Sequence, residues 1–296
     1  MSTYIPQFST EDITNALRKI PYIMATPIEK EFIPTKFEVP FMGTEVDFGE
    51  MMHRNYVFML SLVSVYMAFC YFGKRFMAER EAFDLRLPLA GWNAFLSIFS
   101  FIGVLRTLPT LIADIISKPY QATVCTRPLD SWGVGPTGFW VMLFIFSKIP
   151  ELVDTIFIVL RKKPLIFLHW YHHVTVLMYC WNAYETRTGS GLWFVVMNYS
   201  VHSIMYGYYC LQALHLCPKS FPTYLITLSQ IGQMFVGTGV CISGWYFLYK
   251  GEACAVSTSN LVAGALMYGS YLYLFCAFAV KRYIFKKPKP AAKKLQ

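Results

Sequence analysis

Long apolar segments separated by short polar stretches dominate the sequence. They cover about residues 55–73, 91–114, 138–160, 165–183, 191–213, 222–248 and 260–283. Each is close to the ~20 residues that an α-helix needs to cross ~30 Å of hydrocarbon. The pattern predicts an all-α membrane protein with seven transmembrane helices. The segment that begins near Leu165 has the weakest apolar signal, because it contains three histidines.

The two ends of the chain differ from this helical domain, which we expect over residues 55–285. Residues 1–54 lack the basic start and short apolar core of a signal peptide, and we interpret them as an extramembrane arm. Residues 286–296 form a basic tail that ends in Lys293-Lys294-Leu295-Gln296. Lysines third and fourth from the end resemble the di-lysine signal that retains membrane proteins in the endoplasmic reticulum.

Composition and charge support the membrane class. Only 15% of the residues are charged, whereas soluble domains have about 25%. The net charge of +9 also suits a nucleic-acid-binding protein, but the positions of the basic residues argue against that. With seven spans, fifteen Lys and Arg residues fall on the side of the C-terminus, whereas the short loops on the other side hold four. The positive-inside rule then places the C-terminus in the cytosol and the N-terminus in the lumen.

The eight cysteines include no C-x-x-C pair, which argues against a structural zinc site. Most fall inside the predicted spans, where a buried thiol packs like a small apolar residue. Cys125 and Cys254 instead lie in loops assigned to the non-cytosolic side, where disulfides persist. We predict a bridge between these two cysteines, and two free thiols are the alternative.

Ionisable and polar side chains recur at helical spacing inside four consecutive apolar segments. Ionisable groups cost roughly 2.5–3.5 kcal/mol each at the membrane centre, so they are usually kept for function. The candidates for catalysis are Lys148, Glu151, Asp154, His169, His172, His173, Asn198 and His202. The candidates for substrate binding on the last two of these segments are Tyr206, Tyr209, Gln230 and Gln233.

Depth in the membrane indicates that these groups share one site. Counted from the nearest cytosolic boundary at ~1.5 Å per residue, four of them lie about 9–17 Å inside. These four are Asp154, His169, His202 and Gln230. Helices of alternating direction therefore carry their polar groups to one level, which packing alone would not require.

Two chemistries suit histidines clustered in a membrane. One is a non-haem iron site, as in membrane desaturases and hydroxylases, and the other is metal-free acid–base or nucleophilic catalysis. His53 precedes the first span and His215 lies at a cytosolic edge, which leaves four histidines at the right depth. Four are too few for a histidine-rich di-iron centre, so we favour catalysis without a metal or other cofactor. Iron with carboxylate ligands stays the alternative, whereas a seven-helix receptor or transporter would leave these groups without a task.

Four motifs follow one another in a fixed order. They are Lys148-x-x-Glu151-x-x-Asp154-Thr155, His169-x-x-His172-His173, Asn198-x-x-x-His202-x-x-Met205-Tyr206-x-Tyr208-Tyr209 and Thr227-x-x-Gln230-x-x-Gln233. Together they resemble the signature of the very-long-chain fatty acid elongases, the 3-ketoacyl-CoA synthases of the endoplasmic reticulum. The similarity runs from about residue 72 to residue 283, and no motif residue departs from the pattern.

The resemblance implies the condensation step of chain elongation, in which a long-chain acyl-CoA and malonyl-CoA give 3-ketoacyl-CoA, carbon dioxide and CoA. It also implies a fold in which six of seven helices surround a narrow acyl tunnel. Trp170 and Tyr171 resemble the subgroup that acts on saturated and monounsaturated C12–C18 chains. Expected partners are the two CoA thioesters, the bilayer, other enzymes of the elongation cycle and a second copy of the chain. Nucleic acid is not expected.

A mechanism follows from the chemistry of imidazole. It can attack the acyl thioester to form an acyl-imidazole, which decarboxylated malonyl-CoA then accepts. We expect His172 to be the nucleophile, or the base in a direct reaction, with His202 as its partner. A carboxylate of the first motif would orient a histidine. Asn198 and Gln230 would donate to an enolate or thioester oxygen.

Basic residues near the predicted site are candidates for contact with the CoA phosphates: Arg106, Arg161, Lys162 and Lys163. Arg106, inside the second span, can instead pair with Asp114 or with a carboxylate of the first motif. The other three lie at the cytosolic mouth beside the histidine helix, where they can equally serve as charge anchors.

Overall fold

The computed structural model describes residues 48–285 apart from 134 and 219. The helices in this part of the chain are α2 (Phe48–Arg54), α3 (Tyr56–Phe76), α4 (Arg86–Ser117), α5 (Tyr120–Cys125), α6 (Gly135–Ser147), α7 (Val153–Leu160), α8 (Phe167–Glu185), α9 (Gly191–Ala213), α10 (Thr223–Tyr249) and α11 (Thr258–Ala279). Short turns of other helix types occupy Pro128–Asp130, Pro150–Leu152 and Val280–Ile284. No β-strand occurs among these described residues. The tail 286–296 and nearly all of the predicted arm lie outside them.

Four helices are long and apolar enough to cross a membrane: α3, α4, α10, and α11 with the turn that follows it. The protein is therefore a multi-pass membrane protein. The predicted spans 165–183 and 191–213 also fold as helices, α8 with 19 residues and α9 with 23. These two do not belong to the apolar group, and each contains histidine and asparagine side chains.

The prediction of one continuous helix over residues 138–160 was wrong. α6 ends at Ser147, a single 3₁₀ turn covers Pro150–Leu152, and α7 begins at Val153. Pro150 has no N–H to donate, and its ring would clash with the carbonyl four residues earlier, so an α-helix cannot continue undisturbed through it. Lys148 precedes this turn and Glu151 lies within it, and the two side chains, three residues apart, meet on the same side.

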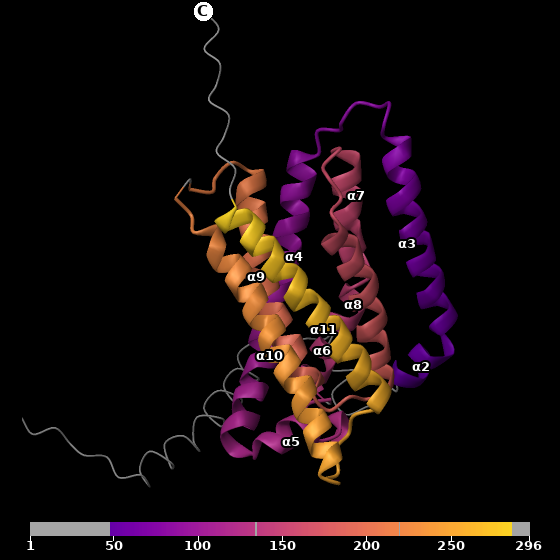
Figure 1. The fold of residues 1–296 in the computed structure, drawn as a ribbon, viewed down its shortest axis with the longest axis vertical. Coiled ribbons are helices and arrows are strands. Elements are labelled where there is room, and N and C mark those ends of the chain that lie inside the picture. The colour runs from indigo at the N-terminus through magenta and orange to yellow at the C-terminus, as the bar shows by residue number, and fades with distance from the viewer. Residues whose placement is uncertain (1–47, 134, 219, 286–296) are drawn as a thin grey trace, which may run out of the picture.

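The helices pack in a cyclic order (Figure 1). α4 packs against α9, α9 against α10, α10 against α11, and α11 against α8, while α6 contacts both α8 and α4. α3 stands outside this order and packs against α7 and α8. Side chains that point inward from the cyclic set therefore share one interior.

Small residues bring α4 and α9 close together. A Cβ atom on Gly103 of α4 would lie 2.5 Å from the ring of Tyr199 on α9, so only glycine fits there. Six residues before Gly103 on α4, the Ser97 hydroxyl donates to the carbonyl of Ser203 at 2.7 Å. Close contact through small residues and interhelical hydrogen bonds is how helices associate where lipid removes the hydrophobic driving force. The contact holds the polar stripe of α9 toward the bundle interior.

Loops close one end of the bundle, which is the lower end in Figure 1. Cys125, at the end of α5, and Cys254, in the loop between α10 and α11, form a disulfide as the sequence predicts. The Ala255 N–H donates to the Cys125 carbonyl, and the Gly189 N–H donates to the Ala255 carbonyl, both at 2.8 Å. A Cβ atom on Gly189 would lie 2.5 Å from the Thr126 carbonyl oxygen. The α3–α4, α7–α8 and α9–α10 loops lie at the opposite end.

Candidate active site

A cavity of about 580 Å³ lies inside the bundle, between α4, α7, α8, α9, α10 and α11. All four histidines predicted at membrane depth line its wall. The predicted site residues in the wall are Asp154, Arg161, Lys163, His169, His172, His173, Asn198, His202, Tyr206, Tyr209, Gln230 and Gln233. Apolar side chains such as Phe157, Met234 and Phe275 complete it. The equal depths read from the sequence thus correspond to side chains that surround one space.

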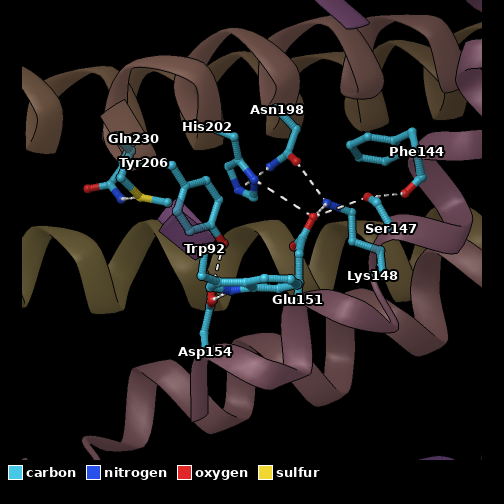
Figure 2. Close-up of polar contacts among 11 residues, drawn as sticks. Trp92, Phe144, Ser147, Lys148, Glu151, Asp154, Asn198, His202, Tyr206 and Gln230 are labelled. Atoms are coloured by element: carbon cyan, nitrogen blue, oxygen red, sulfur yellow. Dashed lines mark hydrogen bonds and ion pairs between the residues drawn. The ribbon is translucent and has the colours of Figure 1, made fainter. Parts of the chain in front are cut away.

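Lys148 and Glu151 do not line the cavity but lie behind its wall. Figure 2 shows the two side chains in contact with each other. The Lys148 ammonium lies 2.6 Å from Glu151 Oε1, and the two side chains are 1% and 4% exposed. Lys148 Nζ also lies 4.1 Å from the centre of the Phe144 ring, and the Ser147 hydroxyl donates to Glu151 Oε1 at 3.2 Å. Two opposite charges in contact offset much of the cost of burying either alone.

The Lys148 ammonium also determines which side chain donates in the hydrogen bond between Asn198 and His202 (Figure 2). Lys148 Nζ donates to Asn198 Oδ1 at 3.1 Å, and an ammonium can only donate. Asn198 therefore turns its NH₂ group toward His202 Nε2, at 3.2 Å. An amide nitrogen is also only a donor, so His202 Nε2 accepts and the imidazole proton sits on Nδ1. That nitrogen lies 3.9 Å from Glu151 Oε1.

Asp154 has both carboxylate oxygens engaged, although neither bond comes from a histidine (Figure 2). The Trp92 indole N–H donates to Oδ1 at 2.6 Å, and the Tyr206 hydroxyl donates to Oδ2 at 2.7 Å. Of the two carboxylates expected to orient a histidine, Glu151 is the one near His202. Asp154 instead holds the Tyr206 ring against the cavity.

The three histidines of α8 form a cluster of rings. The ring centres of His169 and His173 are 4.5 Å apart, and those of His172 and His173 are 5.4 Å apart. His169 Nε2 lies 2.9 Å from the Thr155 hydroxyl. His173 Nδ1 is buried without a hydrogen-bond partner among the described residues. The Tyr271 hydroxyl donates to the His172 carbonyl at 3.1 Å and so ties this turn of α8 to α11.

The two glutamines of α10 also line the cavity wall. Gln230 Nε2 donates to the sulfur of Met205 at 3.3 Å (Figure 2). A thioether is a weak acceptor, so the Gln230 amide can turn toward a carbonyl oxygen at little cost. Asn198, by contrast, is held at both ends of its amide.

Of the four basic residues predicted to contact the CoA phosphates, two line the cavity and two do not. Arg161 and Lys163 line the wall. Lys162 lies between them with φ of 52°, and its ammonium donates to the carbonyls of Ala78 and Arg80 at 3.0 and 2.9 Å. Lys162 thus ties the α7–α8 loop to the α3–α4 loop. Arg106, on α4, is buried and does not line the cavity.

Comparison with known proteins identifies the family. Residues 51–291 match the model of the ELO family, described as the GNS1/SUR4 family. The chain belongs to the ELO family. The very long chain fatty acid elongase 6 of Mus musculus is 40% identical over 257 residues, which cover 86% of this chain and 94% of the mouse protein. The elongase 6 of Gallus gallus is 41% identical over 241 residues, 81% of this chain and 89% of that protein. The elongase 6 of Drosophila melanogaster is 43% identical over 235 residues, which cover 79% of this chain and 74% of that protein.

Within residues 48–285, as far as they are described, no group of three or more His, Cys, Asp and Glu side chains is placed to hold a metal ion. The His172 ring packs near Tyr271 of the neighbouring helix α11, and the His202 ring near Tyr206 of its own helix α9.

Sequence reasoning missed three aromatic partners of the site in this ELO-family chain: Trp92, Tyr66 and Tyr271. Each lies in an apolar segment, where an aromatic residue is first taken as packing. A buried indole N–H or phenol O–H nevertheless needs an acceptor. That requirement is the signal that could have marked them, although it does not identify the acceptor.

Proposed function

We propose that this ELO-family chain is the condensing enzyme of fatty acid elongation, a very-long-chain 3-ketoacyl-CoA synthase. One acyl-CoA, one malonyl-CoA and one proton give one 3-ketoacyl-CoA, one carbon dioxide and one CoA. The relatives named as fatty acid elongases support the reaction class. The observation that carries the proposal is the cavity in which His169, His172, His173 and His202 lie with two cationic side chains.

The first half of the proposed reaction forms an acyl-enzyme on His172, whose imidazole lines the cavity. The unprotonated ring nitrogen attacks the thioester carbonyl, the carbon–sulfur bond breaks, and the thiolate of CoA leaves. The other ring nitrogen gives up its proton, and the thiolate takes a proton to become CoA. A neutral imidazole is a competent nucleophile for this step without a metal.

The second half begins when malonyl-CoA replaces CoA. Its carbon–carbon bond to the carboxylate breaks, carbon dioxide leaves, and the electron pair remains as an enolate. The enolate carbon attacks the acyl-imidazole carbonyl, the carbon–nitrogen bond breaks, and the imidazole regains one proton. Gln230, whose present acceptor is weak, suits donation to the enolate or thioester oxygen.

Asn198 and His202 act beside the nucleophile in this proposal. Because Asn198 is fixed by Lys148, it keeps the lone pair of His202 Nε2 engaged and the proton on Nδ1. His202 is thereby held in one tautomer while acyl and enolate charges develop near it. Preorganised donors and fixed tautomers lower the barrier because they need not reorganise during the reaction.

The arrangement in the membrane is also a proposal. We infer seven transmembrane helices, six of them around an acyl tunnel that continues from the cavity, with α3 outside. The cyclic packing order supports this arrangement. The excess of basic residues in the α3–α4 and α7–α8 loops and in the C-terminal tail supports a cytosolic C-terminus and a lumenal N-terminus. The di-lysine ending supports residence in the endoplasmic reticulum.

The substrate preference that we propose is for saturated and monounsaturated C12–C18 acyl-CoAs. Trp170 and Tyr171 within the histidine motif support it. Arg161 and Lys163, which lie in the cavity wall, suit the phosphates of CoA. Further partners in this proposal are the other enzymes of the elongation cycle and a second copy of the chain.

An iron-dependent desaturase or hydroxylase is the alternative that family membership does not favour. The discriminating test incubates the purified protein with labelled malonyl-CoA and a panel of acyl-CoAs that differ in length and unsaturation. We expect label in 3-ketoacyl-CoA products two carbons longer than the acyl substrate, without added iron. Label that never enters an acyl product, together with iron-dependent oxygen consumption, would favour the oxidase instead.

A further inference from the structure

A chain of hydrogen bonds connects α3, the helix outside the cyclic order, to the histidine cluster. The Tyr66 hydroxyl lies 2.8 Å from the Thr155 hydroxyl. The Thr155 hydroxyl in turn lies 2.9 Å from His169 Nε2. Tyr66 is 5% exposed and Thr155 is fully buried, so water does not compete for these bonds. A residue of the outer helix therefore reaches a side chain in the cavity wall through one intermediate.

The relative acidity of the Tyr66 and Thr155 hydroxyl groups decides which group donates in each of these hydrogen bonds. A phenol is a stronger acid than an aliphatic alcohol and is therefore the better donor. Tyr66 donates to the Thr155 oxygen, which leaves the single Thr155 proton free to donate to His169 Nε2. A histidine nitrogen that accepts carries no proton, so the proton of neutral His169 sits on Nδ1.

Tyr66 also contacts the cluster through its ring. Its centre lies 6.2 Å from that of His173, in a tilted arrangement. The His173 ring in turn lies between those of His169, at 4.5 Å, and His172, at 5.4 Å. One tyrosine thus restrains His169 by a hydrogen-bond chain and supports its neighbour by packing.

We propose that Tyr66 is a positioning residue for the condensation reaction and that it acts through Thr155 on the tautomer and orientation of His169. This inference rests on the proposed function for its effect on turnover. Its structural part, the tautomer of His169, stands on the hydrogen bonds alone. α3 then contributes to the chemistry of the site in addition to crossing the membrane.

The kinetic test compares Tyr66→Phe, Thr155→Val and the double variant with the unchanged protein in the acyl-CoA assay. Each single change removes one hydroxyl group and keeps nearly the same side-chain shape. We expect kcat to fall roughly three- to tenfold for Tyr66→Phe, the worth of one hydrogen bond. KM for acyl-CoA should stay within about twofold, because the lost bond does not contact substrate. The double variant should be no slower than Thr155→Val, because Tyr66 acts only through Thr155.

Two matched variants separate positioning from general damage. Thr155→Ser retains the hydroxyl and should recover most of the activity that Thr155→Val loses. Tyr71→Phe removes a hydroxyl from an exposed tyrosine of the same helix and should leave kcat unchanged. Equal kcat for Tyr66→Phe and the unchanged protein would overturn the proposal. Effects that add in the double variant would also overturn it.

A second readout does not need turnover. In protein labelled with ¹⁵N-histidine and held in lipid nanodiscs, the two ring nitrogens of His169 report which one carries the proton. The His169→Gln variant assigns the signal. We expect an Nδ1–H tautomer in the unchanged protein and a shift toward Nε2–H in Tyr66→Phe. An unshifted His169 signal would refute the role of Tyr66 even if condensation is observed. A protein that shows the shift but no condensation would refute the proposed function instead.

Discussion

Lys148 and Asn198 are 50 residues apart in the sequence, yet the ammonium of the first donates to the amide oxygen of the second at 3.1 Å. This bond decides which end of the amide faces His202 (Figure 2). A cation behind the cavity wall therefore controls the proton of a histidine within it. Lys148 and Asn198 are positioning residues in this interpretation, and the cavity wall presents the imidazoles that react.

Replacement of the Asn198 amide by a carboxylate tests this control. In Asn198→Asp the oxygen that faces His202 Nε2 can only accept, so the imidazole proton must move to Nε2. We expect kcat to fall roughly 10²-fold or more, as for loss of a correctly protonated catalytic group, with little change in KM. Asn182→Asp is the matched control, because Asn182 uses its oxygen to accept from Asn260 and that role survives. Normal turnover by a folded Asn198→Asp protein would show that the tautomer of His202 is irrelevant.

The buried pair of Lys148 and Glu151 should behave as a unit. Lys148→Met leaves the Glu151 carboxylate buried without its partner, which costs about 3–5 kcal/mol of stability. Lys148→Met/Glu151→Leu removes both charges and should recover most of that loss, while activity stays low because Asn198 has lost its donor. Thermal unfolding in detergent, measured beside the condensation rate, separates the two effects. The Glu151→Leu single variant completes the comparison. If the stability losses of Lys148→Met and Glu151→Leu simply add in the double variant, the pairing is contradicted.

His172 should be the residue that carries the acyl group. His172→Ala should abolish condensation and leave the protein folded, because the change removes a cavity-lining ring. Mass spectrometry after incubation with acyl-CoA alone should find an acyl adduct on His172 in the unchanged protein. His215→Asn is the matched control, since His215 is exposed and Asn tolerates its φ of 61°. An adduct on another residue, or none while turnover continues, would reject the assignment.

Gly264 should be intolerant of any side chain. A Cβ atom there would lie 2.7 Å from the Tyr179 hydroxyl oxygen and 3.0 Å from the Cys241 sulfur. Gly264→Ala should therefore lower stability by about 1–3 kcal/mol through overpacking between α8, α10 and α11. Adding Tyr179→Phe removes the closest atom and should recover part of the loss. Gly269→Ala, on the same helix, has open space and should be neutral or stabilising. Similar losses for both alanine variants would mean that the clash does not matter.

Much of the site was predictable because helical periodicity and membrane depth are local properties. Helical spacing identified the four histidines of the cavity wall and Asn198, and depth below the cytosolic boundary supported His169, His202 and Gln230. The break before α7 was missed although Pro150 marks it, because an apolar run of membrane length outweighed one proline.

Other features depended on which helices are neighbours. The sequence cannot show that Asp154 binds Trp92 and Tyr206 rather than a histidine. It cannot show that Lys162 turns to the α3–α4 loop while its two neighbours line the cavity.

The amino-acid sequence by itself determined the helical class and four segments that are long and apolar enough to cross a membrane, and it predicted the level at which polar groups gather. Bilayer thickness and backbone hydrogen bonding act on each segment alone, so a local pattern contains this information. The tertiary structure decided which groups face the cavity and which support them from behind, as Glu151 supports the wall and Tyr66 reaches it through Thr155. The rotation of each helix about its axis and the identity of its neighbours follow from packing between distant segments. A pattern within one segment does not contain that information.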